Sequence, residues 1–207
     1  MGLFDKFKKT NNSKIVEDSK NTIGSEVRNF WYLDDLIHSG SKEIVLDSDI
    51  KLDKKEKSTY LDGIELDVDD IVIDGNGHTI DAQGKVRIFF CTGKNITIKN
   101  ITLKEGCSEN KKSAYNERGG AIYNDSGEIT IIETTFIKNR SNEHGGAIYN
   151  FAGKITITES TFTQNNTMLC GGSIHNKNGE ITITGSSFTQ NTALMSSGQY
   201  PIMKVKY

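Results

Sequence analysis

The sequence holds few cysteines, and their spacing is not that of a disulfide framework or a zinc site. The 207 residues include three, Cys91, Cys107 and Cys170, without CxxC or CxxH spacing. An odd number at such spacing argues against a disulfide framework and against a zinc site. We therefore expect reduced thiols, as in a cytosolic or anaerobic setting, and neither a metal nor another cofactor.

Long apolar runs and a charge excess are also missing. No run of 18 apolar residues occurs, so no transmembrane segment is expected. The net charge of −2 gives no overall attraction to nucleic acid, so no nucleic-acid partner is predicted. Residues 1–24 are polar, predict a flexible segment and lack the apolar core of a secretory signal, which favours a cytoplasmic location. Leu3, Phe4 and Phe7 leave open a short amphipathic helix that touches a membrane or a partner.

What the sequence has is one pattern written three times. The segments 119–144, 145–170 and 171–196 begin GGAIYNDSGEITI, GGAIYNFAGKITI and GGSIHNKNGEITI, at a constant step of 26 residues. A fixed period of roughly 20 to 50 residues marks a solenoid, in which each repeat buries its apolar face against its neighbours.

Each repeat alternates apolar and polar residues instead of following a helical period. The triplet Ile-Thr-Ile recurs at 129, 155 and 181, and such alternation of β-branched residues predicts strands, with glycine pairs at the turns. We therefore predict an all-β fold, a right-handed single-stranded parallel β-helix of about five to six coils. It is expected within residues 41–207.

Stacked coils place like residues above like residues. Isoleucines and phenylalanines are expected to point inward, glycines to allow close backbone approach and asparagines to form amide ladders at bends. The predicted structural columns beside the isoleucines are Gly120, Gly146 and Gly172; Phe136, Phe162 and Phe188; and Asn139, Asn165 and Asn191.

A solenoid end exposes raw core and unpaired strand edges, which natural solenoids cover. A capping helix is predicted within residues 25–40, from Ser25 as N-cap to about His38, with Gly40 at its C-terminal end. The apolar stripe of this helix is expected to be Val27, Phe30, Trp31, Leu33, Leu36 and Ile37.

The regular pattern stops at two places. The step from Ile96 to Ile129 is 33 residues, and the extra residues fall in the polar segment 107–118, which is expected to bulge out as a loop. After Ser196 little chain remains. Either it folds over the last coil, or that end self-associates with another chain end to end; the apolar residues available for covering it are Tyr200, Ile202 and Val205.

The segments IVIDGNGHTIDAQG and GKNITIKNITLKEG, followed by the GGAIYN and STFTQN motifs, resemble adhesin-like repeat proteins of methanogenic archaea. The GGAI and FxxN pairs are also similar to those of chlamydial polymorphic outer-membrane proteins. Both families belong to the pectin-lyase-like, right-handed β-helix group, and the resemblance covers roughly residues 43 to 196. It implies the fold and a cell-surface location, whereas the architecture hosts lyases, hydrolases, epimerases and non-catalytic surface proteins alike.

Acidic residues crowd the first full coil, and the resemblance implies that enzymes of this fold use such carboxylates, often with Ca²⁺. Asp74-x-Asn76 begins like a calcium loop, but Thr79 replaces the required glycine and Lys85 stands where the bidentate glutamate belongs. We interpret Asp74 and Asn76 as turn residues and predict no catalytic or metal ligand here. The other carboxylates of this group are Asp67, Asp69, Asp70 and Asp81.

Threonines recur on the face opposite the isoleucines and form the candidate binding face. A rigid grid of hydroxyls and methyls at the strand spacing of about 4.8 Å suits a repetitive partner such as a glycan, a wall polymer or ice. The alternative is that threonine is the polar residue best suited to strands. The candidate residues are Thr97, Thr130, Thr156, Thr158, Thr182 and Thr184.

Two classes of function follow. The first is a non-catalytic, adhesin-like solenoid that binds or scaffolds, with a carbohydrate or a cell-surface polymer as partner. The second is a small polysaccharide lyase or glycosidase, which requires two carboxylates about 5 to 9.5 Å apart in a cleft. The repeats account for most recurring polar residues, which favours the first class.

Overall fold

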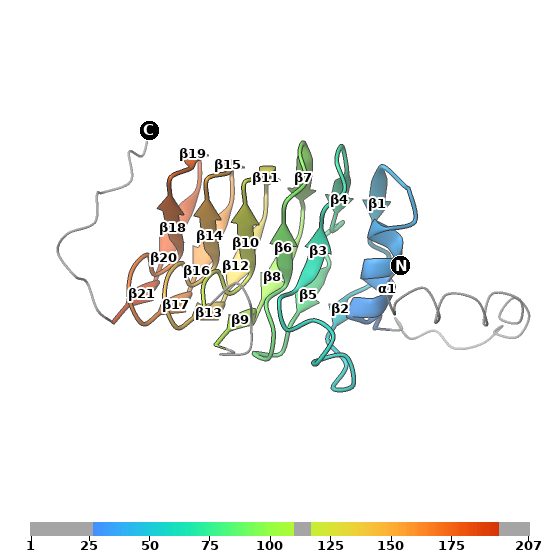
Figure 1. Cartoon of the computed structure of the whole chain (residues 1–207), viewed down its shortest axis with the longest axis horizontal. Coiled ribbons are helices and arrows are strands. Elements are labelled where there is room, and N and C mark those ends of the chain that lie inside the picture. The colour runs from blue at the N-terminus through green and yellow to red at the C-terminus, as the bar shows by residue number, and fades with distance from the viewer. Residues whose placement is uncertain (1–26, 110–116, 195–207) are drawn as a thin grey trace, which may run out of the picture.

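The computed structural model describes residues 27–109 and 117–194. Within them the chain forms one short helix, α1 (Phe30–Ile37), and 21 strands, β1 to β21. The strands wind into a parallel β-solenoid of about six turns, stacked from α1 at one end to β21 at the other (Figure 1). Each strand pairs in parallel with strands one coil away, so the predicted parallel β-helix is confirmed.

Four parallel sheets run along the solenoid, numbered here in the order in which a coil visits them. The first sheet contains β1 (Glu43–Val45), β4 (Val72–Asp74), β7 (Ile96–Lys99), β11 (Glu128–Ile132), β15 (Lys154–Thr158) and β19 (Glu180–Thr184). The second contains β2 (Ile50–Lys51), β5 (Thr79–Asp81), β8 (Thr102–Lys104), β12 (Thr135–Ile137), β16 (Thr161–Thr163) and β20 (Ser187–Thr189). The third contains β9 (Cys107–Ser108), β13 (Arg140–Ser141), β17 (Asn166–Thr167) and β21 (Thr192–Ala193). The fourth contains β3 (Ile64–Leu66), β6 (Phe89–Cys91), β10 (Ile122–Asp125), β14 (Ile148–Phe151) and β18 (Ile174–Lys177).

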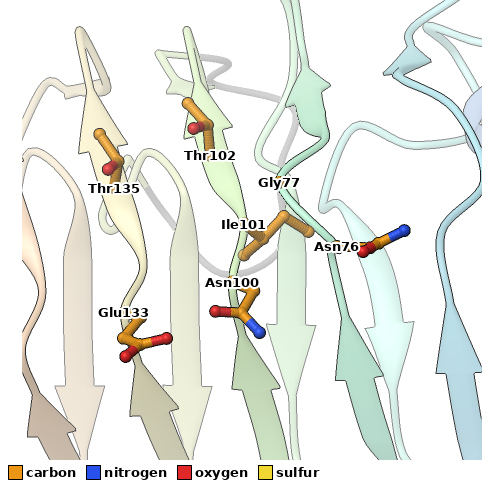
Figure 2. A pocket seen from close by; sticks show the side chains of 7 residues that line it. All are labelled: Asn76, Gly77, Asn100, Ile101, Thr102, Glu133 and Thr135. Atoms are coloured by element: carbon orange, nitrogen blue, oxygen red, sulfur yellow. The ribbon is translucent and has the colours of Figure 1, made fainter.

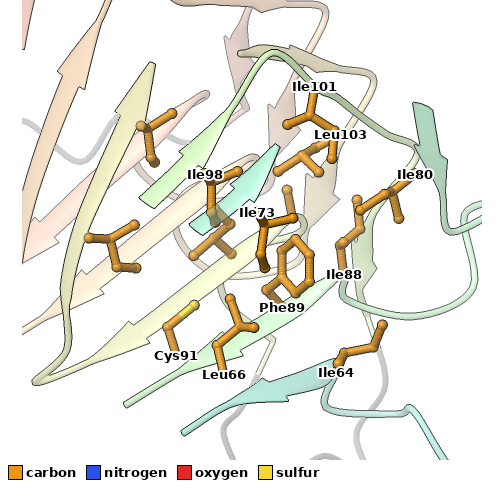
Figure 3. Close-up of a cluster of buried hydrophobic side chains, with 14 of the residues drawn as sticks. Ile64, Leu66, Ile73, Ile80, Ile88, Phe89, Cys91, Ile98, Ile101 and Leu103 are labelled. Carbon is orange, nitrogen blue, oxygen red and sulfur yellow. The ribbon is translucent and has the colours of Figure 1, made fainter. Parts of the chain in front are cut away.

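The 26-residue step sets the register of these sheets. Ile129 pairs with Ile155, and Ile155 with Ile181, so the isoleucines form an inward column. The buried side chains make one continuous core from α1 to the last coil, and Figure 3 shows part of it, where side chains of several sheets meet between the strands. Because alternate residues of a strand point to opposite faces, this register fixes the polar residues of each repeat on the outside.

The helix α1 is shorter than the sequence predicted. Its N-cap is Asn29, whose Oδ1 accepts the backbone N–H of Tyr32 at 3.0 Å, and not Ser25, which lies outside the described residues. Arg28 pairs as an isolated parallel bridge with Ile50, so the chain is still extended just before the helix. A residue with an amide side chain at the junction from extended to helical backbone is a preferred cap.

Four of the six residues of the predicted apolar stripe cover the core, and one of the four, Leu36, is only partly buried. Phe30, Leu33 and Ile37 are buried in the same cluster as the strands. Val27 and Trp31, however, are 57% and 62% exposed, because Val27 precedes the helix and Trp31 stands on its outer side, so their predicted packing was wrong.

The segment 107–118 does not begin as a loop. Cys107 and Ser108 form β9 and pair with Arg140 and Ser141, so these two residues belong to a sheet of the solenoid and not to the predicted loop. Residues 110–116 lie outside the described residues, as do residues 1–26 and 195–207. The predictions on Leu3, Phe4 and Phe7 and on Tyr200, Ile202 and Val205 fall in those segments.

Candidate functional site: two outward hydroxyl columns

The first hydroxyl column lies on the first sheet. Adjacent strands bring its four threonines into direct register, because each stands between two inward isoleucines of its strand. This column consists of Thr97, Thr130, Thr156 and Thr182. Three of the four are half-buried, and Thr182 is exposed, so the hydroxyls stand on a closely packed face and not on a loop.

The neighbouring pair on the first sheet is shorter. Thr158 pairs with Thr184, but Ile132 and Lys99 occupy the same position in the two preceding coils. Threonines therefore stand in two adjacent columns only on the last two strands of this sheet, β15 and β19.

A second hydroxyl column, which was not predicted from the sequence, lies on the second sheet. Its members pair strand by strand along that sheet: Thr79, Thr102, Thr135, Thr161 and Ser187. Each directly precedes the inward Ile, Leu or Phe of its strand, as in TLK, TFI and TFT. This recurrence could have revealed the column from the sequence. Because alternate residues of a strand point to opposite faces, the residue before an inward side chain points outward.

A rigid corner joins the two sheets in each coil. Thr134 N–H donates to Ser160 Oγ at 3.1 Å, and Ser160 N–H donates to Ser186 Oγ at 3.0 Å, so a short hydroxyl ladder links the last three corners. The preceding corner residue is left-handed, with φ of 47° at Glu133 and 51° at Glu159. Thr134 and Ser160 are buried, and their hydroxyls also donate to the Ile132 and Thr158 carbonyls, so these two corners hold the angle between the hydroxyl columns.

An open pocket of about 400 Å³ interrupts this surface, at the corners of the second to fourth coils. Figure 2 shows Glu133 and Thr135 on one side of it, Asn76 and Gly77 on the other, and three residues of the middle coil between them. Those three are Asn100, Ile101 and Thr102.

The acidic residues of the first full coil do not converge on one site. Lys99 Nζ lies 3.2 Å from Asp74 Oδ2, and Lys104 Nζ lies 2.9 Å from Asp81 Oδ2. The remaining three carboxylates accept hydrogen bonds elsewhere: Asp67 from His38, Asp69 from the Lys94 N–H, and Asp70 from Asn95. Across residues 27–109 and 117–194, no group of three or more His, Cys, Asp or Glu side chains is placed to hold a metal ion.

Asp74 behaves as the predicted turn residue. Its Oδ1 accepts the Asn76 N–H at 2.8 Å, which closes an Asx turn. Burial alone would raise the pKa of the Asp74 carboxyl, but the hydrogen bonds from Asn76, Lys99 and Asn100 outweigh it and hold that pKa below its usual value. The carboxylate is thus stabilised in its charged, ion-paired form.

The predicted structural columns lie inside or at the corners of the solenoid. Asn139, Asn165 and Asn191 form a ladder in which each Nδ2 donates to the Oδ1 of the next at 3.0 Å. The glycine column is set by contact, since a Cβ on Gly146 would lie 2.2 Å from the Gly172 carbonyl oxygen. The three cysteines are free thiols, two of them buried.

A second polar cluster lies on the fourth sheet, away from the threonines. Tyr123, Tyr149 and His175 pair in register, and Arg118 lies 5.2 Å from the centre of the Tyr149 ring. Arg118 Nε also donates to Glu143 Oε2 at 2.6 Å. These contacts make the cluster part of the packing between coils.

The model of the Chlamydia polymorphic membrane protein repeat matches residues 133–150, which run from one corner through the next Gly-Gly pair. No curated protein and no solved structure matches the chain significantly. No helix in the described part of the chain is long and apolar enough to cross a membrane.

These findings support the chlamydial half of the resemblance, at the level of the repeat. The cytoplasmic location expected from the N-terminal residues is not supported, because the matched repeat is that of a membrane-protein family and those residues are not described. The chain is a repeat-containing β-solenoid in which residues 133–150 are similar to the Chlamydia polymorphic membrane protein repeat.

Proposed function

We propose that this protein is a non-catalytic, adhesin-like repeat protein that binds or scaffolds an extended polymer at a cell surface. The observation that carries the proposal is the register of the two hydroxyl columns on adjoining sheets. The family match supports the adhesin-like part, since the same corner and Gly-Gly segment is what the repeat model recognises.

The polymer class follows from the geometry of the columns. Hydroxyls repeat along the solenoid at the strand spacing of about 4.8 Å, which is comparable with the length of one sugar unit in an extended polysaccharide. A face held by sheet hydrogen bonds loses little conformational entropy when a partner binds. A glycan or a cell-wall polymer is therefore the proposed partner.

The test uses retention of the purified protein on insoluble or immobilised polysaccharides, neutral and uronate, with and without Ca²⁺. The double variant Thr156→Lys/Thr182→Lys places two long charged side chains on the first hydroxyl column. We expect it to abolish retention, because hydroxyl contacts are lost and the face is blocked.

A matched control adds the same charge elsewhere. Gln164 and Gln190 are exposed, one coil apart, at the corner between the second and third sheets, and Gln164 Nε2 donates to Gln190 Oε1 at 3.1 Å. Gln164→Lys/Gln190→Lys should leave retention unchanged. Retention that survives the threonine variant would move the binding site off this face, and release of reducing or unsaturated ends, lost in Asp74→Asn or Asp81→Asn, would overturn the non-catalytic proposal.

A further inference from the structure

The pocket between the hydroxyl columns lies where a four-residue corner meets the two-residue corners of the next coils. Four residues, 75–78, connect β4 to β5, whereas only Asn100 and Ile101 connect β7 to β8, and only Glu133 and Thr134 connect β11 to β12. The chain therefore extends outward at Asn76 and Gly77 and forms one wall of the pocket.

This wall is anchored by the backbone. Gly75 lies directly against Ile101, where a Cβ would come within 2.4 Å of the Ile101 Cβ, so only glycine fits. Gly77 N–H donates to the Asn100 carbonyl at 2.9 Å, and Asn76 N–H donates to Asp74. The pocket is thus preformed by contacts within the solenoid.

The floor of the pocket differs from the later corners. Ile101 occupies the position of Thr134, Ser160 and Ser186, which carry the hydroxyl ladder. An apolar residue therefore replaces a hydroxyl at the two-residue corner that directly follows the four-residue corner 75–78. Ile101 is 3% exposed, so it offers a small apolar contact without being a separate apolar patch.

The lining suits a sugar ring. Two carboxamides, two hydroxyls and one carboxylate surround the apolar floor, and about 400 Å³ lies in the range of small-molecule sites. Polar side chains around an apolar contact match a pyranose, which has hydroxyls at its rim and C–H groups on its faces. Thr102 and Thr135 belong to both the pocket and the second hydroxyl column, so a polymer following that column passes over the pocket.

Charge selects among sugars. Glu133 is the only charged side chain in the lining. The lysines beside the pocket, Lys99 and Lys104, are paired with Asp74 and Asp81. A uronate or phosphate group would be repelled by the Glu133 carboxylate, and the lining holds no cation to offset that repulsion. Binding of an anionic sugar is therefore disfavoured.

We infer that this pocket is a subsite for one neutral pyranose unit, an inference that rests on the proposed function and names the sugar class for it. Glu133 and the hydroxyls of Thr102 and Thr135 hydrogen-bond the ring hydroxyls, and Ile101 contacts its C–H face. The later corner, which carries Glu159 and Thr161 at the equivalent positions, lies between two-residue corners and lacks the outward wall that residues 75–78 form.

The test measures binding of short soluble sugars to the full chain by saturation-transfer NMR and calorimetry. The probes are maltotriose and cellotriose as neutral trisaccharides and trigalacturonate as the uronate. We expect at least one neutral trisaccharide to bind and trigalacturonate to bind more weakly. Glu133→Gln/Thr135→Val should weaken that binding about fivefold or more, since each lost hydrogen bond is worth about 1 kcal/mol.

The control is Glu65→Gln/Thr92→Val, which changes an exposed glutamate in β3 and an exposed threonine directly after β6, away from both hydroxyl columns, and should leave trisaccharide binding unchanged. No binding of any neutral trisaccharide, tighter binding of trigalacturonate, or equal effects of the two double variants would each overturn the subsite. If polymer retention then still depends on Thr156 and Thr182, the proposed function stands without it. If retention survives in Thr156→Lys/Thr182→Lys while the pocket variant loses trisaccharide binding, the subsite stands and the first hydroxyl column is not the polymer face.

Discussion

The rings of Phe136 and Phe162 lie face to face, with centroids 4.5 Å apart and an angle of 2° between their planes. Phe188 continues the stack at 4.7 Å and 5°. Both centroid distances are close to the strand spacing of about 4.8 Å, so the pairing of the coils sets the distance between the rings. Each coil therefore depends on the next for the burial of its aromatic side chain.

Replacing Phe162 by alanine should lower the free energy of unfolding by about 3–5 kcal/mol, as expected for a fully buried phenylalanine between two neighbours. Phe188→Ala should cost less, because that side chain is 45% exposed. Thr156→Ala on the outer face should cost least. Urea denaturation of the three variants checks this order, and equal losses for Phe162→Ala and Thr156→Ala would show that the inward and outward faces are assigned wrongly.

Asn165, the middle residue of the asparagine ladder, should contribute to stability as a buried core residue does. Asn165 is fully buried; its Nδ2 donates to the Phe136 carbonyl, and its Oδ1 accepts from the Asn139 N–H, each at 3.0 Å. Asn165→Ala should destabilise by about 1–3 kcal/mol for each buried group left without a bond. Asn191→Ala, at the partly buried end of the ladder, should cost clearly less in the same denaturation experiment; the opposite order would contradict the ladder as a source of stability.

Arg87 holds neighbouring coils together from inside the protein. It is fully buried, and its guanidinium donates to the carbonyls of Gly119, Asp62 and Arg118 at 3.0, 3.0 and 2.8 Å. Lysine has one ammonium on a flexible stem and cannot reach three separated carbonyls in this fork geometry.

Arg87→Lys should therefore destabilise by several kcal/mol, at about 1–3 kcal/mol for each buried carbonyl that loses its donor. The control is Arg140→Lys, since the exposed Arg140 pairs with Glu109 at 3.0 Å and such pairs contribute at most about 1 kcal/mol. Thermal and urea unfolding give the comparison, and a loss for Arg87→Lys no larger than for Arg140→Lys would refute the bridging role.

The fold was predictable because the 26-residue period and the alternation of apolar and polar residues both indicate stacked parallel strands. Once Ile129, Ile155 and Ile181 are in register, the inward and outward faces of every sheet follow. The helix start was not predictable in this way, because Ser25 and Asn29 are both good caps and only the bridge from Arg28 to Ile50 decides between them.

The candidate site was predictable in part. The first hydroxyl column follows from the Ile-Thr-Ile triplets. The second was not predicted, although each of its residues stands directly before an inward Ile, Leu or Phe in the sequence. The longer corner at residues 75–78 is visible in the spacing of the inward residues, since Ile73 and Ile80 are seven residues apart whereas Ile98 and Leu103 are five apart. What no spacing reveals is where the extra residues go, because that depends on Gly75 meeting Ile101 in space.

Acidification should weaken the last described coils through His175. This residue stands in the column of Tyr123 and Tyr149, and its ring stacks on His144 with centroids 4.5 Å apart. Burial lowers the pKa of His175 from 6.5 to about 4, and the neighbouring charges of His144, Arg118 and Lys177 act in the same direction. Burial, Arg118 and Lys177 lower the pKa of His144 as well, and only Glu143 opposes this.

The sign of the effect follows from proton binding. Between pH 6.5 and about 4 the unfolded chain binds a proton at this histidine and the folded chain does not, so stability falls as the pH drops through that window. His175→Tyr restores the residue of the two preceding coils and removes this titration. Below pH 6.5 we expect the urea midpoint of the wild type to decline more steeply with falling pH than that of His175→Tyr. Above pH 6.5 residue 175 should contribute nothing to the pH dependence of either protein. Parallel curves for the two proteins would show that His175 is not held neutral by the fold.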